Sequence, residues 1–326
     1  MIYPWQETQW RQITRQRRQD RLPHALLFQG PAGTGKKDFA RALAHALLCS
    51  QPEDSARACG QCEACKLLHA GTHPDLRLLK PTPPANTTSS NPVLSIKIDA
   101  LRDIYRALAE TSQFGGYRVA VIEDADRMPV QAANSLLKTL EEPGRDTVLI
   151  LVSSHPHLLP VTIRSRCQLI RFQVPETAAA LQWLQECGIR DAGKALNIAH
   201  GAPLLARDFL ENHADQRDLL VKALNASSRG EASIQYAQKL APMPKQQLLT
   251  WLLDWVGDLG RLKTCGSDAE LVNEDQRSVL EHNARQADTV RVFRLHDQIN
   301  ELIRAEGIAL NQQLLWENLL ISLDNI

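Results

Sequence analysis

Short apolar runs alternate with amphipathic helical patterns over the first half of the chain. Residues 25–28, 119–122 and 148–152 are apolar throughout and predict strands, and a fourth strand is predicted at 168–172. Between them, apolar residues recur every three or four positions in the segments 38–48, 100–110 and 131–142, which predicts helices. Strands that are apolar on both faces and are separated by helices indicate a parallel sheet covered by helices on each side.

Single residues mark the ends of these elements. Asp99 is expected to cap the helix at 100–110, and Pro143 to end the helix at 131–142. Gly115 and Gly116 interrupt the chain before the strand at 119–122. Residues 81–92, which are rich in proline, serine, threonine and asparagine, predict an exposed loop.

Beyond residue 175 the chain shows helical periodicity alone. Leucines recur at helical spacing in residues 248–256 and again in residues 314–320. Gly201, Ala202 and Pro203 interrupt this region and indicate a boundary near them. The whole pattern predicts an α/β amino-terminal domain followed by an all-helical remainder.

Composition narrows the classes of function. A chain of 326 residues is expected to form two or three domains. Lys plus Arg and Asp plus Glu both number 37, whereas a protein that holds DNA by itself usually has a basic surplus. Five arginines lie between Arg11 and Arg21, and they are interpreted as a solvated helix face. Aromatic residues are scarce and are not interleaved with basic runs, which argues against a stacking platform for single-stranded nucleic acid.

The chain carries no recognisable targeting signal. It has no run of about 18 apolar residues, so no membrane span is expected. The first residues lack the basic and apolar regions of a signal peptide. We therefore expect a cytoplasmic protein, in which cysteines are reduced or bound to metal rather than paired in disulfides.

Residues 30–36 (GPAGTGK) follow a predicted strand and open a predicted helix, which is the context of a phosphate-binding loop. Gly30, Gly33 and Gly35 let the backbone curl so that its N–H groups face a phosphate, and Lys36 would reach the β- and γ-phosphates of ATP or ADP. Lys37 stands where a serine or threonine hydroxyl would ligate Mg²⁺. Nucleotide binding is therefore expected to survive, whereas metal-assisted hydrolysis should suffer.

A pair of acidic residues, Glu123 and Asp124, ends the strand at 119–122. An ATPase with a phosphate-binding loop needs one carboxylate here to organise the metal site and another to polarise the attacking water. An Asp-Glu order is expected for those roles, and here the longer side chain comes first. A misplacement of about 1 Å can cost about 100-fold in rate. The alternative interpretation is that both are ordinary loop residues.

Four cysteines fall within 17 residues: Cys49, Cys59, Cys62 and Cys65. Three of them recur at a spacing of three and can converge if the chain turns, which indicates a structural zinc site with four thiolate ligands. An iron–sulfur cluster is the competing interpretation, although the further C-x3-C-P element of ferredoxins is absent, and free buried cysteines are a third. Cys167, Cys187 and Cys265 are isolated and are expected to be buried apolar residues.

Three segments resemble the bacterial clamp-loader subunits of the AAA+ class. Residues 22–30 (LPHALLFQG) resemble the segment that leads into the family's phosphate-binding loop. Residues 134–143 (NSLLKTLEEP) are close to a clamp-loader signature, and residues 159–167 (LPVTIRSRC) contain the family's Ser-Arg-Cys element. A zinc module just after the loop's helix is shared by gamma/tau and delta-prime subunits of that family. The resemblance covers residues 1 to about 210 well.

The departures from the family pattern resemble the delta-prime group rather than gamma/tau. Gamma/tau subunits hydrolyse ATP and should keep the loop hydroxyl, the Asp-Glu pair and a sensor arginine. Here Lys37 replaces the loop hydroxyl, and the acids stand in the order Glu123-Asp124. Leu204 stands where the sensor arginine would be. The Tyr3-Pro4-Trp5 segment also resembles delta-prime. Arg166, the arginine of Ser-Arg-Cys, is by this resemblance a finger that enters a neighbouring subunit's ATP site.

The resemblance implies an architecture of three domains. Residues 1–172 would form a RecA-like AAA+ domain with the zinc module at 49–65, residues 173–210 a small helical lid, and residues 211–326 a helical collar. Collars of this family join five subunits into an open ring. The implied partners are the gamma/tau and delta subunits, and through them the sliding clamp and primer–template DNA. The implied role is a stator within the DNA polymerase III clamp loader.

Two other functions stay open. The first is an active ATPase of gamma/tau type that tolerates Lys37, which would release phosphate by itself. The second is a zinc-dependent nucleic-acid-binding module, which would bind DNA as a monomer in a salt-sensitive way. The zero net charge weighs against the nucleic-acid-binding module.

Overall fold

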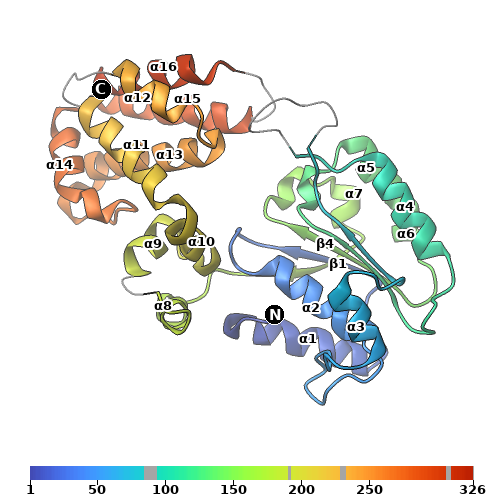
Figure 1. Ribbon diagram of the computed structural model, residues 1–326. Coiled ribbons are helices and arrows are strands. Elements are labelled where there is room, and N and C mark those ends of the chain that lie inside the picture. Colours follow the sequence, from blue (N-terminus) through green and yellow to red (C-terminus); the bar gives the residue numbers. More distant parts are fainter. Residues whose placement is uncertain (84–93, 190–191, 228–232, 306–309, 326) are drawn as a thin grey trace. The chain divides into compact units, whose positions relative to one another are not determined.

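The computed structural model describes residues 1–83, 94–189, 192–227, 233–305 and 310–325. It contains two compact units, an α/β unit within residues 1–179 and a helical unit within residues 180–326 (Figure 1). Residues 84–92 of the predicted loop lie outside the described residues. Within the described ranges, every helix is too short or too polar to span a lipid bilayer.

Five parallel strands form the sheet of the α/β unit. They are β1 (Ala25–Gln29), β2 (Leu76–Leu79), β3 (Arg118–Ile122), β4 (Thr147–Ser153) and β5 (Gln168–Arg171). Their spatial order is β2-β3-β4-β1-β5, which makes β2 and β5 the edges. The four predicted strands are confirmed. The fifth, β2, was missed because a short edge strand with an arginine in it lacks a continuous apolar run.

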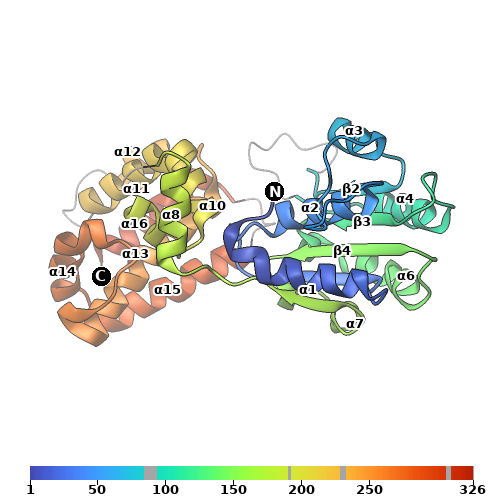
Figure 2. The ribbon, with the colours of Figure 1, turned by 90° about the horizontal axis from the view of Figure 1, so that it is seen from below.

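Seven helices belong to the α/β unit within the described residues: α1 (Glu7–Arg18), α2 (Lys36–Leu48), α3 (Glu63–Ala70), α4 (Ile98–Ala109), α5 (Val130–Ser135), α6 (Leu137–Glu141) and α7 (Val161–Arg164). Short 3₁₀ turns occupy Pro4–Gln6, Ala125–Arg127 and Pro156–Leu158. The α1 helix runs along the sheet (Figure 2).

Two details of these helices differ from the sequence-based prediction. The helix predicted at 131–142 is broken at Leu136, whose N–H bonds the carbonyl of Ala133 rather than continuing the α-helical ladder. The neighbouring Ser135 hydroxyl donates to the Ala132 carbonyl at 2.6 Å, a back-bond that distorts helices. Asp99 does not cap α4, because the helix begins at Ile98 and Asp99 instead pairs with Arg102.

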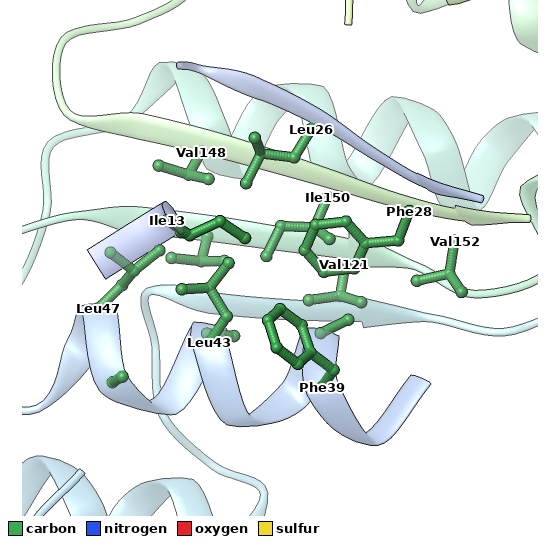
Figure 3. Packing of buried hydrophobic residues seen from close by; sticks show 14 of the residues in the cluster. Ile13, Leu26, Phe28, Phe39, Leu43, Leu47, Val121, Val148, Ile150 and Val152 are labelled. Atoms are coloured by element: carbon green, nitrogen blue, oxygen red, sulfur yellow. The ribbon is translucent and has the colours of Figure 1, made fainter. Parts of the chain in front are cut away.

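The period of two along each strand divides the core between the two faces of the sheet. Leu26 and Phe28 of β1 face α1 and α2, with Val148, Ile150 and Val152 of β4 beside them (Figure 3). The intervening β1 residues, Ala25 and Leu27, join the core under α4 to α7. The parallel register places the carboxyl ends of β1, β3 and β4 along one edge, where side chains that follow these strands can meet.

Within the described residues the helical unit contains α9 (Ala192–Ile198), α10 (Pro203–Asp208), α11 (Ala214–Ser227), α12 (Ser233–Leu240), α13 (Lys245–Cys265), α14 (Arg277–Gln286), α15 (Thr289–Arg304) and α16 (Gln312–Asp324), and α8 (Thr177–Glu186) leads into it. The long α13 is central, since it packs against α14 and α15 and buries Leu248, Leu252 and Trp255. The prediction of an all-helical remainder is confirmed.

A single helical path runs from α10 to α11. A π-helical turn, Phe209–His213, joins them, so residues 203–227 are helical throughout. The predicted limit between lid and collar, at 210/211, falls inside this path. The division of the helical unit into a lid at 173–210 and a collar at 211–326 stays a prediction.

A buried polar network connects α9, α11 and α13. Arg217 is fully buried and holds Asp275 with both terminal nitrogens, at 3.1 and 2.9 Å, while it donates to Asn273 at 2.8 Å. The buried carboxylate of Asp258 accepts from the backbone and side chain of Asn273, each at 2.8 Å. Lys194 of α9 adds a 3.1 Å ion pair to Asp275. Burial alone would raise the pKa of Asp275, but these partners lower it to about 2.

Removing the arginine should destabilise this unit strongly. We expect Arg217→Met to cost about 3 kcal/mol of unfolding free energy, because a partly buried carboxylate and an amide lose their donor. Lys222→Met, an exposed change on the same helix, should stay within about 0.5 kcal/mol. Hydrogen exchange followed by mass spectrometry on peptides of α11 and α13 measures the difference. Equal protection in the two variants would contradict a stabilising role for the network.

Candidate nucleotide site, metal centre and surface arginine

The loop from β1 to α2 depends on glycines at the carboxyl edge of the sheet. A Cβ on Gly30 would lie 1.9 Å from the carbonyl oxygen of Phe172, so no larger residue fits. Gly33 and Gly35 have φ values of +73° and +85°, which side-chain-bearing residues rarely adopt. This backbone is compatible with a loop that turns successive N–H groups toward one phosphate.

Lys36 begins α2 and is buried over this loop. Its ammonium donates to the carbonyl oxygen of Pro31 at 2.6 Å. Burial, with Lys37 beside it, lowers the pKa of Lys36 to about 8. Since that value is still above 7, the side chain is mostly charged at neutral pH and can attract an anion to the loop.

Both carboxylates after β3 are paired with cations of α2. The Lys37 ammonium lies 2.6 Å from Asp124, and the Arg41 guanidinium lies 2.6 Å from Glu123. Glu123 is only 3% exposed, so its carboxylate has Arg41 rather than water as its partner. Lys37 and Arg41 are four residues apart and therefore lie on the same face of the helix. Sequence reasoning missed Arg41, and this spacing was the available signal.

A third acid, Asp126, lies in the 3₁₀ turn after β3 and reaches the segment that follows β4. It accepts from the Ser154 N–H at 3.2 Å and contacts the His155 ring at 3.3 Å. Burial opposes its charge, but the hydrogen bonds of His155 and Ser153 hold the pKa of Asp126 below its usual range. Asp126 was also missed, because it lies beyond the acidic pair and its partners come from the end of β4 and the residues after it.

The amino-terminal segment holds the loop from outside. Trp5 and Gln6 donate from their side chains to the carbonyl oxygen of Thr34, at 3.1 and 2.8 Å. The Tyr3 hydroxyl donates to Asp38 at 2.9 Å, and its ring stacks on Trp5 with centroids 5.0 Å apart. These contacts join residues about 30 positions apart, so no local pattern could reveal them.

The four cysteines predicted to bind metal converge. The Sγ atom of Cys49 lies 3.6 Å from that of Cys59 and 3.8 Å from that of Cys62. The Sγ atoms of Cys59 and Cys65 are 3.9 Å apart. A tetrahedral zinc ion with bonds of about 2.3 Å would place its sulfurs about 3.8 Å apart. The separations fit that geometry and are far too long for disulfides, which need about 2.05 Å. The cluster can therefore hold a metal ion such as zinc.

Backbone N–H groups surround these sulfurs. The amides of Cys59, Cys62 and Cys65 each donate to a cysteine sulfur at 3.4 Å. Such donors favour the thiolate form that metal binding requires. The cluster extends from the end of α2 into the first turn of α3, in a stretch with few buried apolar residues.

The three cysteines outside the cluster differ in burial. Cys167 is buried, as expected, and burial raises its pKa to about 12. Cys187 and Cys265 are exposed, so the expectation for them was wrong. Each lies at the end of a helix, where the apolar face no longer meets a partner.

Arg166 lies between α7 and β5 and contacts the neighbouring signature segment. Two of its nitrogens bond Glu141, at 3.1 and 2.7 Å, and a third donates to the Thr162 carbonyl at 3.2 Å. Its side chain remains 38% exposed. The two segments that carry the family resemblance, 134–143 and 159–167, thus meet through this ion pair. Leu204 lies in α10 of the helical unit.

The fold and the site together define the class of protein. A parallel sheet with a phosphate-type loop after β1, paired acids after β3, a four-cysteine module and a helical remainder is the RecA-like AAA+ architecture expected of clamp-loader subunits. A family model described as DNA polymerase III, delta subunit, matches residues 5–176. A second, described as DNA polymerase III, delta subunit, C terminal, matches residues 211–325.

Comparison with individual proteins narrows the family. The chain is 34% identical to DNA polymerase III subunit delta′ of Pseudomonas aeruginosa, covering 98% of this chain and 96% of that one. It is 31% identical to the Escherichia coli delta′ subunit, covering 99% and 95%. Subunit tau of Bacillus subtilis is 36% identical, but only over 48% of this chain and 25% of its own. The chain belongs to the family of DNA polymerase III delta-prime subunits.

Loss of one thiolate should remove the metal. We expect the purified wild-type chain to contain about one metal ion per chain, and Cys62→Ala to contain essentially none, because a structural site needs all four ligands. Elemental analysis by mass spectrometry measures the content. Cys187→Ala, an exposed cysteine outside the cluster, is the matched control. Equal metal content in Cys62→Ala and wild type would contradict the assignment.

Proposed function

We propose that the chain is a clamp-loader subunit of the DNA polymerase III holoenzyme that does not hydrolyse ATP itself. The observation that carries the proposal is the ion pair between Lys37 and Asp124. The ammonium lies where a hydroxyl would ligate Mg²⁺, and it pairs with Asp124, the carboxylate at the position that would polarise the attacking water. A fixed cation of this kind repels a divalent metal and cannot replace it as a Lewis acid.

The other carboxylate, that of Glu123, is also paired with a cation. Glu123, at the position that would organise the metal site, is buried against Arg41, so it is poorly available to a metal ion. Releasing it would leave a buried charge without its partner, which costs several kcal/mol, about 3–5 in comparable pairs. Both carboxylates that hydrolysis would need are therefore paired with cations of the chain itself, Asp124 with Lys37 and Glu123 with Arg41.

The phosphate-binding part remains usable. Gly30, Gly33 and Gly35 keep the loop backbone open, and Lys36 keeps a charged ammonium above it. Lys37, paired with Asp124, occupies the position from which a hydroxyl would hold the metal ion. These features support binding of ATP or ADP without a requirement for Mg²⁺ and without turnover.

Arg166 is the residue proposed to act on a neighbouring subunit. Its guanidinium is partly exposed and is held by Glu141 rather than buried in a core. A surface ion pair of this kind is worth only about 0–1 kcal/mol, so a γ-phosphate of higher charge can displace Glu141. The free guanidinium would then stabilise charge that develops in the transition state of a gamma/tau ATP site.

The roles proposed for the four-cysteine cluster and for the helical unit are those expected of the family. The four-cysteine cluster would hold a structural zinc ion that staples residues 49–65. Residues 173–210 and 211–326 would act as lid and collar, the collar joining this chain to gamma/tau and delta subunits in a ring. The sliding clamp and primer–template DNA would be reached through that cytoplasmic complex, since the zero net charge gives the chain little attraction for DNA alone.

Nucleotide assays on the isolated chain test the first part. We expect no release of phosphate from Mg²⁺-ATP, and binding of a fluorescent ADP that is equally strong with Mg²⁺ and with EDTA. Lys36→Met should weaken that binding about tenfold or more, because a charge-assisted contact to phosphate is lost. Lys37→Thr should make binding depend on Mg²⁺, since the hydroxyl ligand is restored.

Brisk phosphate release by the isolated wild-type chain would overturn the proposal and favour an active ATPase of gamma/tau type. Binding of ADP that needs Mg²⁺ in the wild type would contradict the role given to Lys37.

The role proposed for Arg166 has to be tested in the reconstituted clamp-loader complex. We expect Arg166→Ala to leave assembly intact but to depress DNA-stimulated ATP turnover at the adjacent site by about 10³-fold, the scale of effect of such fingers. Where several ATP sites contribute, the measured loss in total turnover is smaller, and the rate of clamp loading is the sharper measurement. Arg171→Ala, an exposed arginine on β5, is the matched control. Wild-type loading by Arg166→Ala would remove the assignment.

A further inference from the structure

The carbonyl oxygen of Thr34, within the nucleotide loop, is held by two side chains of the amino-terminal segment. Gln6 donates to it through Nε2 at 2.8 Å, and Trp5 donates through its indole Nε1 at 3.1 Å. Gln6 is fully buried, and its Oε1 accepts a hydrogen bond from the Tyr3 N–H at 3.0 Å, so both ends of its amide are used. The Thr34 oxygen therefore points at the amino-terminal segment.

The direction of this oxygen also sets the direction of the next N–H group. The peptide bond between Thr34 and Gly35 is trans, and the C=O and N–H groups of a planar trans peptide point in opposite directions. The Gly35 N–H is therefore turned away from the amino-terminal segment. The side of Gly35 on which a Cβ would stand is packed against that segment, because such an atom would lie 2.5 Å from the Tyr3 ring.

The Gly35 N–H is left as a donor for a ligand. Gly35 is the residue before α2, and no acceptor within the described part of the chain bonds its N–H. N–H groups at the start of a helix are donors that hold phosphate groups in proteins. A donor that precedes the buried Lys36 and is turned away from the amino-terminal segment suits a phosphate oxygen.

A second contact connects Thr34 to Lys36. The Thr34 hydroxyl donates to the Pro31 carbonyl at 3.0 Å, and the Lys36 ammonium donates to the same oxygen at 2.6 Å. Thr34 is fully buried, so its carbonyl and its hydroxyl together fix this part of the loop. Through Thr34, the amino-terminal segment is thus connected to a backbone donor and to the ammonium of the loop.

We propose that Gln6 and Trp5 are positioning residues of the nucleotide site, which hold the Thr34 carbonyl so that the Gly35 N–H is aimed at a phosphate oxygen. This inference rests on the proposed binding of ATP or ADP by the loop. Without the two donors, rotation of the peptide unit would turn the N–H away and present a carbonyl oxygen to the phosphate. The glycine in that peptide unit makes rotation easy, because glycine populates positive and negative φ about equally.

Backbone relaxation measured by ¹⁵N NMR on the full chain without nucleotide tests the positioning directly. We expect an order parameter of about 0.85 for the Gly35 N–H in the wild type, typical of rigid backbone, and of less than about 0.6 in Gln6→Met. Methionine is close to glutamine in length and offers no N–H donor. The amides of β1 should keep their wild-type order parameters in this variant, which a general loss of structure would not allow.

Binding of a fluorescent ADP to the same chains tests the consequence. Gln6→Met should bind ADP about tenfold more weakly than the wild type, because the loop loses its buried hydrogen bond. Trp5→Phe removes the indole N–H but keeps an aromatic ring against Tyr3, so it should bind about threefold more weakly. Trp5→Phe also tests the inference if Gln6→Met does not fold.

Gln9→Met is the matched control, since it makes the same change on the same segment. Gln9 donates to the Arg171 carbonyl at 3.0 Å rather than to the loop, so the Gly35 order parameter and the ADP affinity should stay as in the wild type.

Equal Gly35 order parameters in the wild type, Gln6→Met and Trp5→Phe would overturn the inference, and so would equal ADP affinities of the three chains. The order parameters are measured without nucleotide, so they decide the positioning independently of ADP. A wild-type chain with the expected order parameter that binds no ADP would overturn the proposed nucleotide site rather than the hold of Gln6 and Trp5 on the loop.

Discussion

Two carboxylates that follow β3, of which Glu123 is buried and Asp124 is partly exposed, are paired with two cations of α2, and this pairing fixes the carboxyl edge of the sheet. Parallel strands bring Glu123 and Asp124 next to the start of α2, where two acids without partners would repel each other and resist burial. Lys37 and Arg41, one turn apart on α2, remove that cost. The same ion pairs that stabilise this edge of the sheet also occupy the groups that a hydrolytic metal site would need.

The loop beside these pairs is held in place by distant parts of the chain. Gly30 packs against the backbone of Phe172 at the end of β5, and Thr34 accepts hydrogen bonds from Trp5 and Gln6. A loop fixed from both sides loses little entropy when it binds an anion, and it has little freedom to rearrange with the state of a nucleotide. That rigidity agrees with the proposal that this subunit does not hydrolyse ATP itself.

Elements that lack a sufficient apolar core are stabilised by polar or metal-binding groups instead. The segment 49–65 has few buried residues and gathers four sulfurs at separations that suit a tetrahedral metal. In the helical unit, Arg217 and Asp258 hold the segment around Asn273 and Asp275 by hydrogen bonds, beside the buried Ala269 and Leu271. Such contacts are directional, so they fix geometry as well as adding stability.

Local patterns in the sequence determined the strands β1, β3, β4 and β5, the glycine loop, the acidic pair and the cysteine cluster, because each depends on spacing within about 20 residues. Tertiary structure decided the rest. It paired Arg41 with Glu123, laid the amino-terminus against Thr34, brought Glu141 to Arg166 and left Cys187 and Cys265 exposed. These outcomes depend on which elements become neighbours in space, and periodicity along one segment carries no information about its neighbours.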